Sequence, residues 1–178
     1  MLKGLLIGFC VVVVAVILFM FPGDVMGSDD MRNYTLSKAY LMKNTEQYAR
    51  CYNSVNYGTS GLIDIELALM SEYFNDPRVT SEVMKPVEES FLKGIKQECD
   101  KSISDYESAY KTAEEIQTKS ESLSVGWRTF VFGGGNQSIP ASEVLEYSPA
   151  RARMSLAFND YIFTHDEAEM FYRKQLGL

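Results

Sequence analysis

An uninterrupted apolar run that begins at Leu5 and ends at Phe21 constrains this chain more than any other feature. None of its side chains is charged, and four consecutive valines lie within it. A helix of this length extends roughly 25 Å, near the lower limit for crossing the hydrocarbon core of a bilayer. Because Lys3 precedes the run and Asp24 follows it, the positive-inside rule predicts a cytoplasmic N-terminus and a periplasmic or extracellular remainder. We therefore expect a single-pass membrane protein whose run contacts the lipid bilayer.

The alternative is a cleaved signal peptide, since Val25 and Gly27 stand at the two positions that a signal peptidase reads before Ser28. The apolar run is longer than the core of a usual signal peptide, about 7–15 residues, and this favours an uncleaved anchor. Residues 1–27 are thus expected to form the membrane anchor (or signal peptide). Residues 28–178 are long enough for one extracytoplasmic domain with its own core.

The part of the chain beyond the anchor is acidic. The whole chain has 17 Lys and Arg, 24 Asp and Glu, and a net charge of −7. Because Lys3 is the only charged side chain before Asp24, the remainder carries 16 basic and 24 acidic residues, a net of −8. This balance argues against nucleic acid as a partner and against electrostatic adhesion to anionic lipid.

Apolar residues recur at three- and four-residue steps along three stretches of the domain, as is typical of helices. We expect residues 28–32 to be a polar tether and a first helix to run from about Thr35 to Gly58, which would cap it. A second helix should begin after Thr59 or Ser60. A third and longest helix carries Pro86 at its first turn or at a kink near its start. Its apolar stripe comprises Val87, Phe91, Ile95, Cys99, Ile103, Tyr106, Tyr110, Ala113 and Ile116.

The second predicted helix is apolar over an unusually wide arc. Leu62, Ile65, Leu69 and Tyr73 share one face. A second row lies beside them and consists of Ile63, Leu67, Met70 and Phe74. Apolar residues on so wide an arc predict a helix buried on more than one side.

Helix-start signals divide the C-terminal part of the chain. Pro140 and Pro149 are expected as first residues of helices, with Ser148 capping the second. Thr164 and Glu167 have the capping-box spacing, so another helix should begin at His165. The whole pattern predicts an all-α fold, an N-terminal transmembrane helix followed by a bundle of four to six helices.

Cys51 and Cys99 each fall on the apolar stripe of a predicted helix, the first and the third. Both side chains should therefore face one core, and an oxidising compartment favours a disulfide between them. Closing such a loop would stabilise the fold by about 4 kcal/mol. The alternative, two buried free thiols, applies if the domain is cytoplasmic. A catalytic redox pair is disfavoured because neither cysteine lies in a Cys-x-x-Cys motif.

An aromatic segment follows the third predicted helix and contains Trp127, Arg128, Phe130 and Phe132. Three consecutive glycines come next, and each costs a helix about 1 kcal/mol relative to alanine. We expect one non-helical, aromatic and glycine-rich segment here. Trp, Phe and Arg anchor protein interfaces, so these four residues are the candidate partner-binding residues. The alternative is an aromatic plug that covers the open end of the bundle.

Residues that carry enzyme chemistry are sparse. His165 is the only histidine, so His-rich metal sites are excluded and a serine or cysteine triad is disfavoured. The acidic residues beside it fit the first turn of a helix, facing its positive end. The glycine-rich segment has neither the Lys-Ser/Thr ending of a P-loop nor the spacing of a dinucleotide fingerprint. We therefore predict no catalytic residue, no cofactor and no metal.

The leading hypothesis is a membrane-anchored, extracytoplasmic, non-enzymatic protein that binds or positions a protein partner within a cell-envelope complex. One alternative is a membrane-tethered or secreted cell-wall glycan hydrolase that uses a glutamate as general acid. Another is a periplasmic inhibitor or immunity-type protein, which needs only a complementary surface.

Overall fold

The computed structural model describes residues 27–124 and 138–178. These ranges contain five helices and no strand, so the all-α prediction is confirmed. The helices are α2 (Ser28–Glu72), α3 (Ser81–Ser124), α5 (Ala141–Leu145), α6 (Pro149–Met154) and α7 (His165–Leu176). No helix in the described ranges is long and apolar enough to cross a membrane. The expected anchor at residues 5–21 lies outside them.

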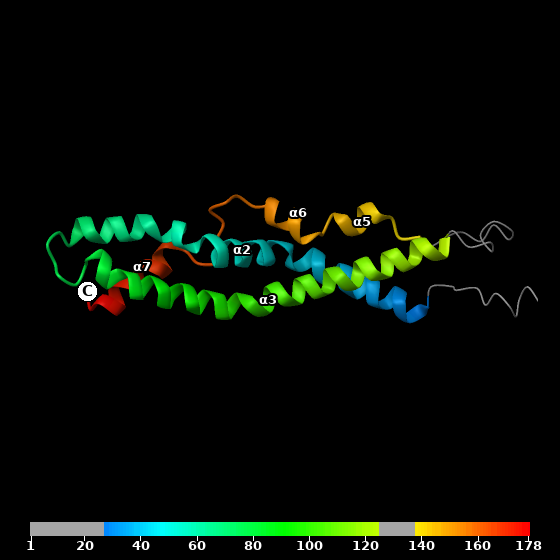
Figure 1. The fold of residues 1–178 in the computed structure, drawn as a ribbon, viewed down its shortest axis with the longest axis horizontal. Coiled ribbons are helices and arrows are strands. Elements are labelled where there is room, and N and C mark those ends of the chain that lie inside the picture. The colour runs from blue at the N-terminus through cyan, green and yellow to red at the C-terminus, as the bar shows by residue number, and fades with distance from the viewer. Residues whose placement is uncertain (1–26, 125–137) are drawn as a thin grey trace, which may run out of the picture.

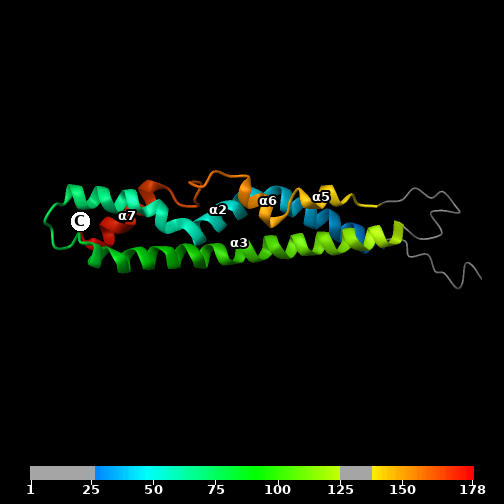
Figure 2. The same cartoon turned by 45° about the horizontal axis from the view of Figure 1, so that its top comes forward.

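The two long helices form an antiparallel hairpin that sets the length of the molecule (Figure 1). The 45 residues of α2 extend about 67 Å at 1.5 Å per residue. The short helices lie along this hairpin, with α5 and α6 beside one half and α7 beside the other (Figures 1 and 2). We call the connection between α2 and α3, residues 73–80, the tip, and the opposite end of the hairpin the base.

The predicted break at Gly58 is wrong, because α2 continues through it to Glu72. Gly58 is buried, and a Cβ added to it would come within 2.6 Å of Leu92 Cδ2 on α3. A Cβ on Gly61 would similarly meet the ring of Tyr161 at 2.7 Å. Both glycines therefore permit close approach of neighbouring segments, which local sequence patterns do not distinguish from a helix end.

The predicted polar tether at residues 28–32 is also wrong, because α2 begins at Ser28 with Gly27 as its N-cap. Asp29 and Asp30 occupy the first turn, where acidic side chains interact favourably with the positive end of the helix dipole. The base of the hairpin is thus helical from its first described residues.

The tip reverses the chain. Tyr73 caps α2 by donating its backbone N–H to the carbonyl of Leu69 at 2.9 Å. Asn75 has a φ of 69°, a left-handed conformation that asparagine tolerates better than most residues. α3 then begins at Ser81, so Pro86 is its sixth residue and lies beyond the first turn.

The core follows the seam between α2 and α3. The predicted stripe of α3 is confirmed, since its members are buried or half-buried. From α2 it meets Leu41, Tyr48 and Cys51 near the base and middle, and Leu62, Ile65 and Leu69 near the tip. Side chains of the C-terminal helices complete these clusters, with Val144 and Ala152 toward the base and Tyr172 toward the tip.

The C-terminal helices pack against this seam. Pro149 is the first residue of α6, and Ser148 caps it by accepting from the Arg151 N–H at 3.4 Å, as predicted. Pro140 is the N-cap of α5 and not its first residue. The capping box of Thr164 and Glu167 is present, so the predicted start of α7 is confirmed.

Candidate protein-docking site

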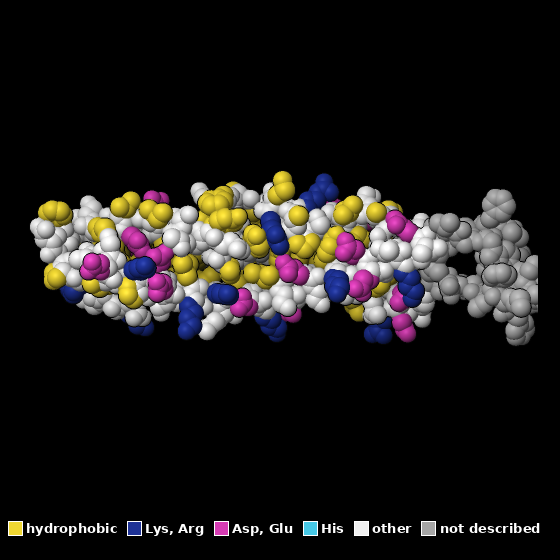
Figure 3. Space-filling model, in the orientation of Figure 1, with side chains coloured by type: hydrophobic (Ala, Val, Ile, Leu, Met, Phe, Trp, Pro, Cys, Tyr) yellow, Lys and Arg dark blue, Asp and Glu magenta, His cyan; other side chains and the backbone are white. Residues whose placement is uncertain are grey.

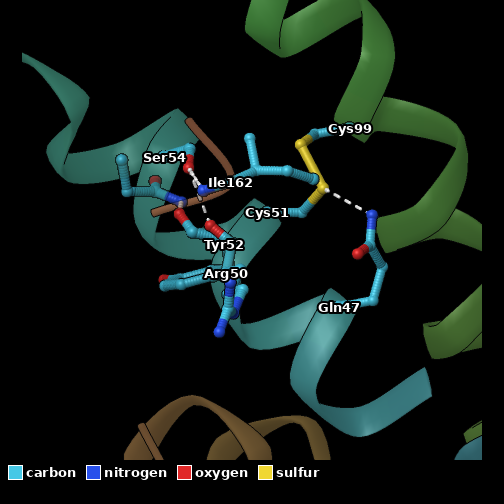
Figure 4. Close-up of a disulfide and its surroundings, with 8 residues drawn as sticks. Gln47, Arg50, Cys51, Tyr52, Ser54, Cys99 and Ile162 are labelled. Carbon is cyan, nitrogen blue, oxygen red and sulfur yellow. Dashed lines mark hydrogen bonds between the residues drawn. A yellow bond between two sulfur atoms is a disulfide. The ribbon is translucent and has the colours of Figure 1, made fainter. Parts of the chain in front are cut away.

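Cys51 and Cys99 form the predicted disulfide, which joins α2 to α3 near the middle of the hairpin (Figure 4). Their Cα atoms are 5.2 Å apart across a sequence separation of 48 residues, and both side chains are fully buried. The bond therefore fixes the two long helices to each other between the base and the tip.

The segment before α7 is attached to α2 beside this disulfide. Ser54 Oγ accepts the backbone N–H of Ile162 at 2.8 Å and donates to the carbonyl of Arg50 at 2.8 Å (Figure 4). Phe163 follows and packs edge-on against Phe91 of α3, with ring centroids 5.2 Å apart. One irregular segment thus contacts both long helices at the level of the covalent link.

A polar cluster around Arg153 holds α6 against the hairpin. Arg153 Nε donates to Tyr48 Oη at 3.0 Å, and its Nη2 contacts Glu107 Oε1 at 3.3 Å. Tyr48 Oη in turn donates to Glu107 Oε1 at 3.1 Å, and the Tyr48 ring stacks on Tyr106 with centroids 4.2 Å apart. Burial raises the pKa of Tyr48 to about 12, although the bond from Arg153 acts in the opposite direction. Tyr48 therefore stays protonated near neutral pH and acts here as a packing and hydrogen-bonding residue.

The base joins three parts of the chain. Lys119 of α3 pairs with Asp30 of α2. The backbone N–H of Ile139 donates to Ser120 Oγ at 3.0 Å, so the chain re-enters the described structure beside the end of α3. Glu143 of α5 pairs with Lys38, and this partner lowers the pKa of the carboxyl group. The first turn of α2, the end of α3 and the start of the C-terminal part thus lie at one end.

The predicted partner-binding residues Trp127, Arg128, Phe130 and Phe132 lie outside the described residues. The chain enters that segment after Ser124 and leaves it before Ser138, both at the base. Their assignment as a binding surface therefore stays a prediction.

Four apolar side chains on the outer side of α2 form a row toward the tip, which we call the distal stripe. It consists of Ile63, Leu67 and Met70 on α2 and Phe74 two residues past its end. Ile63 is 48% exposed, Leu67 59% and Phe74 80%, while Met70 is half-buried. Figure 3 shows yellow hydrophobic side chains along the upper edge of the left end, over this part of α2. The second predicted helix does contact both α3 and α7, but the burial expected for its second row is wrong at Ile63, Leu67 and Phe74.

The spacing explains why these residues are left outside. Leu62, Ile65 and Leu69 already fill the face toward α3, and each is fully buried or nearly so. At about 100° per residue, Ile63 and Leu67 point away from that face, whereas Met70 lies nearer to it and packs against the core near the tip. The other large exposed apolar side chains of the described ranges do not form such a row: Leu36, Met42, Tyr57, Val83, Leu145, Met154, Phe158 and Met170.

Charged side chains flank the distal stripe without crossing it. Between Cys51 and Tyr73, α2 contains three acidic residues and no basic one. Asp64 and Glu66 lie on opposite sides of the stripe, and Glu66 accepts a hydrogen bond from Tyr172 at 2.8 Å. The third, Glu72, pairs with Arg173 of α7. The stripe thus has an uncharged centre and acidic edges.

His165 is exposed at the start of α7, 3.6 Å from Glu169 and 3.9 Å from Asp166. In residues 27–124 and 138–178, no three His, Cys, Asp or Glu side chains are grouped so that they could hold a metal ion. The arrangement around His165 is that of a helix first turn.

Comparisons with known proteins give no relative for this arrangement. The chain matches no protein-family model, no curated protein and no solved structure. Residues 27–124 and 138–178 form a disulfide-linked helical hairpin with an exposed apolar row on its α2 side.

Proposed function

We propose that this protein is a membrane-anchored, extracytoplasmic stalk that binds or positions a protein partner within a cell-envelope complex. The observation that carries the proposal is the distal stripe, a row of apolar side chains on one face of α2. Contiguous exposed apolar surface marks interaction sites more often than isolated exposed residues do. The stripe supports a binding role because Leu67 and Phe74 are more than half exposed.

The length of the hairpin supports the positioning role. The N-terminal run leads into α2 at the base, and the distal stripe begins 35 residues after Ser28, about 50 Å along the helix. A disulfide at mid-length keeps the two helices together over that distance. A partner bound at the stripe would be held away from the bilayer.

We also propose Trp127, Arg128, Phe130 and Phe132 as a second contact region. The support is compositional, since aromatic and arginine side chains supply most strong interface contacts. In this proposal these four residues contact envelope components, and the stripe contacts the positioned partner.

The test uses full-length protein cross-linked in its native membranes with a short amine-reactive reagent. The wild type should give a discrete adduct with one partner. The double variant Leu67→Ser/Phe74→Ser should lower its yield by about ten-fold, because it removes two apolar contacts. The matched control is Leu36→Ser, since Leu36 lies on the same helix with the same 59% exposure as Leu67.

The free energies of unfolding of the wild type and the two variants should agree within about 0.5 kcal/mol, because the changes are at exposed positions. Equal adduct yield from the double variant and the wild type would show that the stripe does not bind the partner. A fall in the turbidity of purified cell walls on adding the wild type would instead support the alternative that the protein is a glycan hydrolase.

A further inference from the structure

We infer that the distal stripe binds one amphipathic helix whose polar face is rich in lysine and arginine. This rests on the proposed function, because it specifies the chemistry of the partner at the same surface. Three properties of the stripe lead to it: its helical spacing, its length and the sign of the charges beside it.

The spacing suits a helix lying along α2. Ile63, Leu67 and Met70 follow one another at steps of four and three residues, and Phe74 continues the row at the tip. Two helices pack side by side when each offers apolar residues at such steps. Phe74 is eleven residues after Ile63, which corresponds to roughly 17 Å of helix and matches about three turns of a partner helix.

The charges beside the stripe determine which sign of charge a partner helix should carry. Glu72 is paired with Arg173, and Glu66 accepts a hydrogen bond from Tyr172 but has no cationic partner on α2. Asp64 and Glu66 thus flank the stripe with no basic residue on this part of α2. A partner helix would place its own flanking side chains opposite these two carboxylates. Lysine or arginine there would gain attraction, and aspartate or glutamate would be repelled. The net charge of −8 beyond the anchor adds a long-range field of the same sign.

The same charges disfavour a second copy of the chain as the occupant. Two stripes placed face to face would bring only acidic α2 side chains together along both edges. An anionic membrane surface is disfavoured for the same reason.

The chain's own residues 125–137 cannot reach the stripe. Both ends of this segment are attached at the base, where Ile139 bonds Ser120. Thirteen residues that go out and return reach about 22 Å when fully extended. Leu67 lies 37 residues along α2 from Asp30, which is at the base, and this corresponds to about 55 Å.

The experiment uses the full-length chain in nanodiscs of zwitterionic phosphatidylcholine, with a photoreactive benzophenone residue at position 67 or, as a control, at position 36. Leu36 has the exposure of Leu67 but lies on a face of α2 that carries Arg32 and Lys43. Two labelled helical peptides serve as probes. Both carry leucine at alternating three- and four-residue steps, and their remaining positions are lysine in one and glutamate in the other.

The lysine peptide should cross-link at position 67 at least about ten-fold more than the glutamate peptide, and more than it does at position 36. Adding Phe74→Ser should lower its yield at position 67 several-fold. High salt should reduce the difference between the two peptides, because it screens exposed charges.

Equal cross-linking of both peptides at position 67 would overturn the inference and leave an apolar docking surface without charge selection. A dominant product joining position 67 of two chains would overturn it in favour of a second copy. If neither peptide reacts at position 67 but Leu67→Ser/Phe74→Ser still loses its partner in native membranes, the inference fails and the proposed function stands. If the double variant keeps its partner, the proposed function itself fails.

Discussion

The guanidinium carbon of Arg153 lies 3.9 Å from the ring centroid of Tyr52, so a cation of α6 rests on an aromatic face of α2. The same guanidinium group also donates to Tyr48 and contacts Glu107 of α3. One side chain therefore connects α6 to both long helices.

Replacing Arg153 with alanine should lower the free energy of unfolding by about 1–2 kcal/mol. The variant loses a cation–π contact and a charge-assisted hydrogen bond, and partial exposure of the side chain limits the effect. Urea denaturation followed by circular dichroism measures the change. Arg151→Ala is the matched control, because Arg151 is exposed on the same helix, and its effect should stay within about 0.5 kcal/mol. Equal losses of unfolding free energy from both variants would show that the contacts of Arg153 with Tyr48, Tyr52 and Glu107 do not stabilise the domain.

Removing the disulfide with Cys51→Ser/Cys99→Ser should destabilise the domain by about 4 kcal/mol, since the bond closes a loop of 48 residues in the unfolded chain. The measurement is denaturant unfolding of the oxidised wild type, the reduced wild type and the double variant. In intact cells, the two thiols should react with a labelling reagent only after denaturation and reduction. Labelling after denaturation alone would show that the cysteines are not bonded there.

Gly61→Ala should destabilise the protein by about 1 kcal/mol although alanine favours helices. The new Cβ would lie 2.7 Å from Tyr161 and would displace a ring that stacks on Phe163 with centroids 5.1 Å apart. Gly94→Ala on α3 is the control, because its Cβ would meet nothing within 4 Å. It should stabilise the helix by about 0.5–1 kcal/mol. Thermal unfolding of the two variants should therefore shift in opposite directions.

The domain should lose stability as the pH rises above 10. Burial raises the pKa of Tyr48 to about 12, and it raises the pKa of Tyr34 and Tyr172 as well. Each tyrosine therefore holds its proton more tightly when folded than when unfolded, so its contribution is complete below pH 10 and is lost as the pH rises through the folded pKa. Tyrosinate absorbance and circular dichroism followed together should show ionisation coupled to unfolding. Tyr48→Phe should reduce the loss of stability at alkaline pH and leave the stability at acidic pH unchanged in its dependence on pH.

Short sequence patterns predicted those parts of the fold that depend on interactions between residues close in the sequence. The start of α7 depends on Thr164 and Glu167, which bond each other's backbone N–H groups within one turn, so four residues are enough to predict it. The disulfide was predictable because Cys51 and Cys99 lie on apolar stripes, and the pairing of two long helices brings such stripes together.

The features that the sequence did not reveal depend on distant residues. Gly58 resembles a helix end, but its position is explained by Leu92 on α3, which no local pattern reports. The row containing Leu67 and Phe74 resembles a second buried face, but both side chains are exposed in the described part of the chain. The positions of the charged residues indicated more, because the apolar row and the acidic residues beside it occupy separate parts of the helix surface, as at a docking surface. The residues Trp127 and Phe130 lie outside the described chain, and their role stays a prediction.

The disulfide between Cys51 and Cys99 also turns the outer half of the hairpin into a covalent ring. The tip and the whole distal stripe lie inside that ring, because every residue from 52 to 98 is bounded by the two cysteines. A single proteolytic cut anywhere in this interval opens the ring but releases no fragment. The stripe would remain joined to the N-terminal part of the chain after such a cut, and two cuts within the interval would be needed to detach it.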